Sequence, residues 1–198
     1  MGEVIRLDER RAQAEPSSPV SDADLLSASL GGSVSAREQL FRRHYPRILR
    51  LAHRLLGRED DAEDLAQDVC VMALGQLETV RDPNAFAGWL TRICVFRARS
   101  RIRHYAVLRR LRLVPERVVD PDHVVSRTAP PDVAMELKQL YRHLRALSAD
   151  ARIALVLRRV EGLSIAEISE RMGRSPATVK RRIAEGHAVL QRMERGVT

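Results

Sequence analysis

The stretch that decides the fold spans residues 163–183 and reads LSIAEISERMGRSPATVKRRI. Ser164 is followed three residues later by Glu167, which is the signature of a capping box, and apolar residues then recur at helical spacing. Gly173 can adopt the left-handed conformation that ends a helix. Ser175 can cap a second helix, whose first position is a proline that needs no N–H there. The stretch therefore predicts two short helices joined by a tight turn.

The second of these helices turns Val179 and Ile183 inward and presents a polar, basic face. That outward face carries Thr178, Lys180, Arg181 and Arg182. A recognition helix lies in the major groove with such side chains toward bases and phosphates. We therefore predict a helix-turn-helix that reads DNA. An ordinary helical hairpin with a solvated basic face is the alternative, but it does not explain the order of cap, turn glycine and basic face.

Length and charge set the limits around this motif. The chain has 198 residues and a formal net charge of +8, which suits one or two small domains and an anionic partner. The charge is unevenly distributed. Residues 58–68 hold six acids and one base, whereas residues 97–112 hold seven arginines and no acid. The first segment should attract a basic partner and the second should attract phosphate.

The two cysteines, Cys70 and Cys94, lie far apart and lack metal-ligand spacing, so we expect reduced core thiols and no metal or other cofactor. The longest apolar run, residues 69–74, is far shorter than the roughly 18 residues that span a bilayer. Residues 1–20 are charged and then rich in Pro and Ser, unlike a signal peptide. These features predict a cytoplasmic protein without membrane insertion.

Hydrophobic periodicity divides the chain into four parts. Residues 1–21 lack it and are predicted to form a disordered tail. Residues 22–105 carry successive amphipathic helical stripes, and residues 132–194 regain that pattern. Between them, residues 106–131 contain four prolines and no sustained period, which predicts a flexible linker. No strand pattern occurs, so the fold class is all-α, with two small helical domains.

Four segments together resemble the extracytoplasmic-function group of bacterial RNA polymerase sigma factors. They are DAEDLAQDV at 61–69, FAGWLTRI at 86–93, VEGLSIAEI at 160–168 and TVKRR at 178–182. Their order matches the family as well as their content. The resemblance makes the first domain sigma region 2 and the second sigma region 4. It implies a protein that binds core polymerase, reads two promoter elements and helps to melt the duplex.

In the family, an acidic helix docks on a basic coiled coil of core polymerase. The resemblance implies this role for Asp61, Glu63, Asp64, Gln67 and Asp68. Carboxylates also favour any helix N-terminus, which is the alternative explanation for Asp61. That effect fades for Asp64 and Asp68, which lie deeper in the helix.

The loop at residues 75–85 and the helix that follows correspond to the part of the family that captures a base flipped out of the −10 element. The resemblance implies −10 contacts for Arg92, Phe96, Arg97, Arg99, Ser100 and Arg103, with the arginines holding phosphates. This chain departs from the family there. Phe96 stands where relatives usually carry asparagine, Ser100 where they often carry aspartate or asparagine, and Met72 where lysine is common. Phe96 either stacks on a base or packs in the core or against the linker, since it lies seven residues after Trp89 on the same helical stripe.

Contacts with the −35 element are implied for the start of the recognition helix. The residues are Ser175 and Thr178, which would hold backbone phosphate, and Lys180, Arg181 and Arg182. Glu185 and His187 replace positions that are usually basic, which weakens the phosphate grip farther along the helix.

The partners implied are core RNA polymerase, double-stranded and locally melted promoter DNA, and an anti-sigma factor as a candidate. Two other classes compete with this hypothesis. A conventional helix-turn-helix regulator would bind an operator without joining the polymerase, but it would not need the acidic helix. A nucleic-acid enzyme would need a metal-carboxylate cluster or a nucleophile with its base, and the sequence justifies neither. We therefore expect a non-enzymatic initiation factor.

Overall fold

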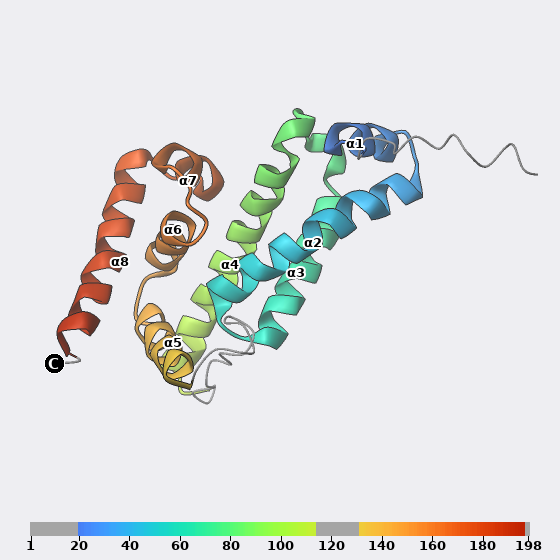
Figure 1. The fold of residues 1–198 in the computed structure, drawn as a ribbon. Coiled ribbons are helices and arrows are strands. Elements are labelled where there is room, and N and C mark those ends of the chain that lie inside the picture. The colour runs from blue at the N-terminus through green and yellow to red at the C-terminus, as the bar shows by residue number, and fades with distance from the viewer. Residues whose placement is uncertain (1–19, 114–130, 197–198) are drawn as a thin grey trace, which may run out of the picture.

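The computed structural model describes residues 20–113 and 131–196, and in these ranges every regular element is a helix (Figure 1). The N-terminal half holds α1 (Asp22–Leu30), α2 (Val34–Leu56), α3 (Glu59–Leu74), two short 3-10 turns (Leu77–Thr79 and Pro83–Ala85) and α4 (Phe86–Arg110). The C-terminal half holds α5 (Pro131–Leu144), α6 (Ala149–Arg159), α7 (Ile165–Met172) and α8 (Pro176–Gly196). The all-α prediction is confirmed. Most of the predicted tail and linker lies outside the described residues.

The N-terminal half is a bundle in which α2, α3 and α4 share one core, with α1 packed on α2. The amphipathic stripes seen in the sequence supply that core, and Leu55, Leu65 and Phe86 are completely buried. Trp89 is half-buried against the same cluster, with its ring 5.7 Å from that of Phe86. Burial of these stripes against one another is what holds the three helices together.

Helix α4 continues to Arg110, five residues past the boundary predicted at residue 105. Residues 106–113 contain neither proline nor glycine, so nothing in this stretch stops the helix early. Ile102 is buried and keeps the last turns of α4 against the rest of the molecule. The long helix therefore reaches the C-terminal half.

The two halves pack directly on each other, which the sequence did not predict. One continuous hydrophobic cluster includes Leu90 and Val95 of α4 together with Leu157 of α6 and Ile168 of α7. Tyr141 of α5 donates its hydroxyl to two backbone carbonyls at the end of α2, 3.3 and 3.2 Å away. These contacts make the described residues one packed unit with a shared core.

The turn after α2 is shaped to receive this contact. Gly57 ends α2 with a left-handed backbone (φ 67°). A Cβ placed on Gly57 would lie 2.5 Å from Cδ1 of Tyr141, which is closer than such atoms can approach. Glycine is therefore required here twice, by the backbone angle and by the ring from the other half.

Candidate nucleic-acid interface

The helix-turn-helix predicted from the sequence is present in α7 and α8. The Ser164 hydroxyl accepts from the Glu167 amide at 3.2 Å, and the Glu167 carboxylate accepts from the Ser164 amide at 2.8 Å. Gly173 has the left-handed conformation (φ 60°), and the Ser175 hydroxyl accepts from the Thr178 amide at 3.3 Å. The capping box, the turn and the second cap thus fix the angle between the two helices.

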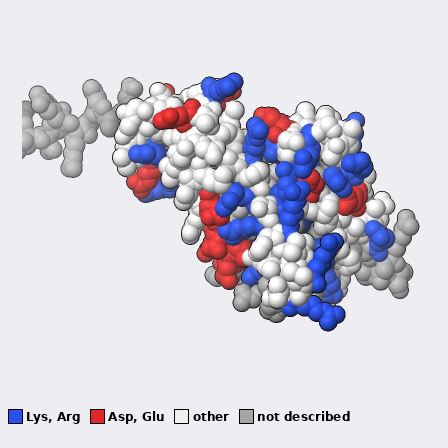
Figure 2. Space-filling view, turned by 180° about the vertical axis from the view of Figure 1, so that it is seen from behind, with Lys and Arg blue, Asp and Glu red and all other residues white. Residues whose placement is uncertain are grey.

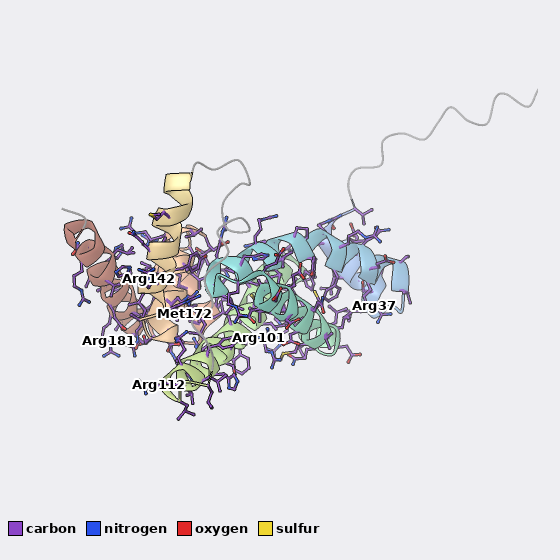
Figure 3. The ribbon with its side chains drawn as sticks, turned by 90° about the horizontal axis from the view of Figure 1, so that it is seen from below. Arg37, Arg101, Arg112, Arg142, Met172 and Arg181 are labelled. Carbon is purple, nitrogen blue, oxygen red and sulfur yellow. The ribbon has the colours of Figure 1, made fainter. Side chains whose placement is uncertain are left out.

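The start of α8 exposes most of the predicted −35 residues. Ser175, Lys180 and Arg181 are exposed, and Arg181 lies at the outer edge of the molecule (Figure 3). Arg182 differs from them. It is half-buried, it donates to the Glu185 carboxylate at 2.8 Å, and it faces the last turns of α4 across a groove. The structure therefore separates Arg182 from the outward face that carries its neighbours.

The five residues predicted to dock on polymerase split into two groups. Asp61 is buried and accepts from the Tyr105 hydroxyl at 2.8 Å, and Asp68 accepts from Arg97 at 2.9 Å and from Arg101 at 2.8 Å. Burial opposes ionisation of Asp68, but these two arginines outweigh it and lower the pKa of its carboxyl. Both acids tie α3 to α4.

Glu63, Asp64 and Gln67 form the other group and face solvent. Two apolar side chains that sequence reasoning missed extend their surface: Val71 is 69% exposed and Leu74 is 44% exposed. They follow Gln67 by four and seven residues, which places them on the same helix face. This spacing could have revealed them in the sequence. We call Glu63, Asp64, Gln67, Val71 and Leu74 the α3 face.

In helix α4, likewise, only some of the arginines are exposed to solvent. Arg97 is held by Asp68, and Arg99 is held by the C-terminal half, with an ion pair to Asp150 at 2.6 Å and a hydrogen bond to the Met172 carbonyl at 2.8 Å. The residues that remain open lie along one stripe, which we call the α4 face: Arg92, Phe96, Ser100 and Arg103. The Phe96 ring is 59% exposed, so the alternative of a core position is wrong.

The space-filling view shows how these charges lie on one side of the molecule. Lys and Arg side chains gather along the middle of this side, with a group of Asp and Glu beside them (Figure 2). The separation of acidic and basic segments in the sequence therefore persists on the surface, even though several of the acids and arginines pair with each other.

Asp150, in the first turn of α6, is a site residue that sequence reasoning missed. Its carboxylate accepts from Arg174 at 3.0 Å and pairs with Arg99 at 2.6 Å, while Arg103 lies 3.9 Å away. Burial opposes its ionisation, yet Arg99 and Arg174 lower the pKa of the carboxyl. An acid at a helix start looks ordinary in a sequence, and only tertiary packing shows that it joins both halves.

Within residues 20–113 and 131–196, no helix is long and apolar enough to cross a membrane, and no group of three or more His, Cys, Asp and Glu side chains could hold a metal ion.

Comparison with known proteins fits this geometry. The model for Sigma-70 region 2 matches residues 40–107, and the model for Sigma-70, region 4 matches residues 137–186. The ECF RNA polymerase sigma factor SigM of Mycobacterium tuberculosis (strain ATCC 25618 / H37Rv) is 34% identical over 174 residues, which cover 87% of this chain and 84% of SigM. The chain belongs to the extracytoplasmic-function (ECF) sigma factors.

Other relatives agree with this membership. The ferric citrate uptake sigma factor FecI of Escherichia coli (strain K12) is 31% identical to this sigma factor, over 90% of this chain and 100% of FecI. Among solved structures, CnrH in complex with the cytosolic domain of CnrY has a TM-score of 0.61 and 26% identity, covering 89% of this chain and 99% of CnrH. No catalytic family is among the matching models.

As a sigma factor, the protein binds core RNA polymerase and directs initiation at specific promoters. The alternative of a helix-turn-helix regulator that does not join the polymerase is not favoured, because region 2 accompanies region 4 in this chain.

Proposed function

We propose that this sigma factor divides promoter-specific initiation among three exposed surfaces. The α3 face docks on core polymerase, the α4 face captures the melted −10 element, and the start of α8 reads the duplex −35 element. The observation that supports this division most is the exposure of one part of each charged segment while the rest is used in internal ion pairs.

At the α3 face, Glu63, Asp64 and Gln67 contact a basic surface of the polymerase, and Val71 and Leu74 add apolar contact at its edge. Exposed carboxylates speed association with a basic partner. The apolar area that is buried on binding contributes most to the lifetime of the complex. Asp61 and Asp68 act indirectly, because they hold α3 in register with α4.

At the α4 face, Phe96 stacks on a base that has left the duplex, while Arg92 and Arg103 hold phosphates and Ser100 offers a hydrogen bond. Flipping a base costs a few kcal/mol, and stacking on an aromatic ring recovers about 1–3 kcal/mol of it. Arg97 and Arg99 already pair with Asp68 and Asp150, so they contribute less to DNA binding than the exposed arginines do.

At α8, Lys180 and Arg181 meet base edges, and Ser175 and Thr178 hold the backbone beside the helix start. The hydroxyls of Ser175 and Thr178 already lie 3.0 Å apart, so one phosphate oxygen can be shared between them. Arg182 contacts a phosphate beside the recognition face, and this phosphate competes with the Glu185 carboxylate for the Arg182 guanidinium.

Binding of both promoter elements requires the two halves to separate. The names of the elements place them about 25 base pairs apart, which is ~85 Å at 3.4 Å per base pair. Helix α4 has 25 residues, so it is only ~37 Å long at 1.5 Å per residue, and α7 packs against it. The packed arrangement is too short to span both elements, and we expect it to describe the free protein. An anti-sigma partner and a cytoplasmic location remain our expectations.

The decisive experiment is run-off transcription with purified core polymerase and genomic fragments, combined with a core-binding competition. The double variant Glu63→Lys/Asp64→Lys should weaken core binding and transcription together, with helical content and thermal stability near wild type. Glu38→Lys on α2 is the charge-reversal control, since Glu38 is exposed and its ion pair is with Arg42, one turn away on the same helix. Unchanged core affinity in the double variant would refute the docking surface.

A further inference from the structure

A basic groove lies where the last turns of α4 meet the turn between α5 and α6. It encloses about 850 Å³, and we call it the junction groove. Its walls include five arginines, three from α4 and two from the C-terminal half: Arg103, Arg109, Arg110, Arg145 and Arg182. Ile102, Val107 and Leu147 give the groove an apolar part. Both halves of the molecule therefore contribute to one cationic hollow.

Among the described residues, the two acids at the junction groove already have partners. Asp150 is the one acid among its lining residues, and its close pairs are with Arg99 and Arg174, which do not line the groove, while Arg103 of the groove lies 3.9 Å away. Glu185 sits at one edge, where it accepts from Arg182 and from the Ser148 hydroxyl at 3.1 Å. The surplus of positive charge thus lies on the α4 side, where the Arg103 side chain is 60% exposed and Arg110 is exposed.

The positive potential extends to a buried neighbour, Arg152 of α6. Only 4% of Arg152 is exposed, its guanidinium lies 5.6 Å from the centre of the Tyr141 ring, and its Nε and Nη2 atoms make no hydrogen bond in the structure. Burial is the main reason that its pKa falls to about 10, and the charges of Arg145 and Arg109 lower it further, against an opposing effect of Tyr141. A bound anion would relieve this repulsion.

The size and chemistry of the junction groove select its ligand. Guanidinium groups bind phosphate oxygens through paired hydrogen bonds. Their planar shape matches a phosphate group better than the compact ammonium group of lysine does. A hollow of this volume matches sites for whole small molecules, about 300–1,000 Å³, and exceeds what a single phosphate ion fills. We propose that the junction groove binds a nucleoside polyphosphate, with its phosphates on Arg109, Arg110 and Arg145 and its nucleoside against the apolar part.

Such a ligand would hold the two halves together, because each half supplies part of the site. A molecule that binds only the packed arrangement stabilises it by mass action. It would therefore oppose the separation that promoter binding requires, and this consequence rests on the proposed function. Binding itself does not depend on that function.

Thermal-shift and calorimetric titrations of the full chain test the binding. The probes are ATP, inorganic triphosphate and inorganic phosphate, without polymerase or DNA. ATP should raise the melting temperature most and triphosphate less, because triphosphate lacks the nucleoside, whereas phosphate at equal concentration should not raise it. Arg109→Gln/Arg110→Gln should weaken binding of both by at least tenfold. The control Arg37→Gln/Arg50→Gln removes the same charge from α2, away from the groove, and should bind like wild type.

Folding of each variant is checked by circular dichroism, and Arg110→Lys provides a milder change that keeps the charge but loses the paired hydrogen bonds. An affinity between wild type and the double variant supports the proposal. No binding of ATP at millimolar concentration, equal loss in the α2 control, or binding of triphosphate as tight as that of ATP would overturn it. Displacement of triphosphate by a short DNA duplex, sensitive to Arg109 and Arg110, would assign the groove to the DNA backbone instead. Because the assay contains no promoter, its failure leaves the proposed function untouched.

Discussion

Helices α4 and α8 are both proposed to read promoter DNA, yet they use their basic residues differently. Helix α4 is enclosed on two sides, by α2 and α3 and by α6 and α7, and it gives Arg97 and Arg99 to internal ion pairs. The start of α8 packs on one side only and leaves Lys180 and Arg181 exposed. A run of arginines therefore indicates a phosphate surface reliably only where the helix has a free side.

The largest expected effect comes from breaking the ion pairs that enclose α4. Asp150→Ala leaves Arg99 and Arg174 without their carboxylate, and loss of one partner of a buried pair costs about 3 kcal/mol. Urea unfolding should show a loss of that size. Asp64→Ala is the control, since its side chain is 69% exposed and lies 3.9 Å from Arg101, so it should cost less than about 0.5 kcal/mol. Equal losses would show that Asp150 does not join the halves.

The ion pairs of Asp150 also predict that the stability of the fold depends on pH. The pKa of Asp150 is lowered from its ordinary value of 3.8, so the stability it contributes is present above pH 3.8 and is lost as pH falls through the lower folded pKa. Asp150→Asn should remove this part of the acid destabilisation. Urea midpoints measured from pH 6 down to pH 3 would show it as a shallower decline, and an identical decline would contradict the assignment.

The third prediction concerns the exposed start of α8. A bidentate arginine contact with guanine contributes ~1–3 kcal/mol of discrimination, whereas a phosphate contact weakens all sequences alike. Arg181→Ala should therefore relax specificity at one or two −35 positions. Arg182→Ala should mainly reduce affinity and the salt dependence of binding, because Arg182 turns away from the outward face toward Glu185 and is proposed to contact a phosphate. A salt-titrated binding assay with a promoter library separates the two, and the reverse pattern would mean that the helix is rotated in the groove.

A smaller effect is expected from two glycines that share one backbone conformation. Gly57 (φ 67°) faces Tyr141 of the other half, whereas a Cβ on Gly173 (φ 60°) would meet nothing within 4 Å. Gly173→Ala should cost only the left-handed strain, about 1 kcal/mol. Gly57→Ala adds the collision with the ring, so its loss in urea unfolding should be larger by about 1 kcal/mol. Equal losses would indicate that the Tyr141 ring can move away from position 57 at little cost in free energy.

How far the sequence could predict this molecule depends on the distance between interacting residues. Caps at Ser164 and Ser175 act over three positions, so the helix-turn-helix was predictable in detail. The pairing of Arg99 with Asp150 spans about fifty positions and depends on how two helical halves pack, which no local pattern encodes. The sequence therefore predicted α8 well and overestimated how much of α4 is open to DNA.

Phe96 gives the smallest expected change in stability and so the cleanest test of the open side of α4. Its ring is 59% exposed, and burial of a whole phenylalanine contributes about 1.5–3 kcal/mol, so Phe96→Ala should cost less than about 1 kcal/mol. Leu90→Ala, two turns earlier and 1% exposed, should cost about 2–5 kcal/mol. Against this small cost, Phe96→Asn should change the base preferred at the captured −10 position in a promoter library, because a stacking ring is replaced by a hydrogen-bonding amide. An unchanged preference would leave the exposed ring without a role in DNA and would limit the α4 face to phosphate contacts.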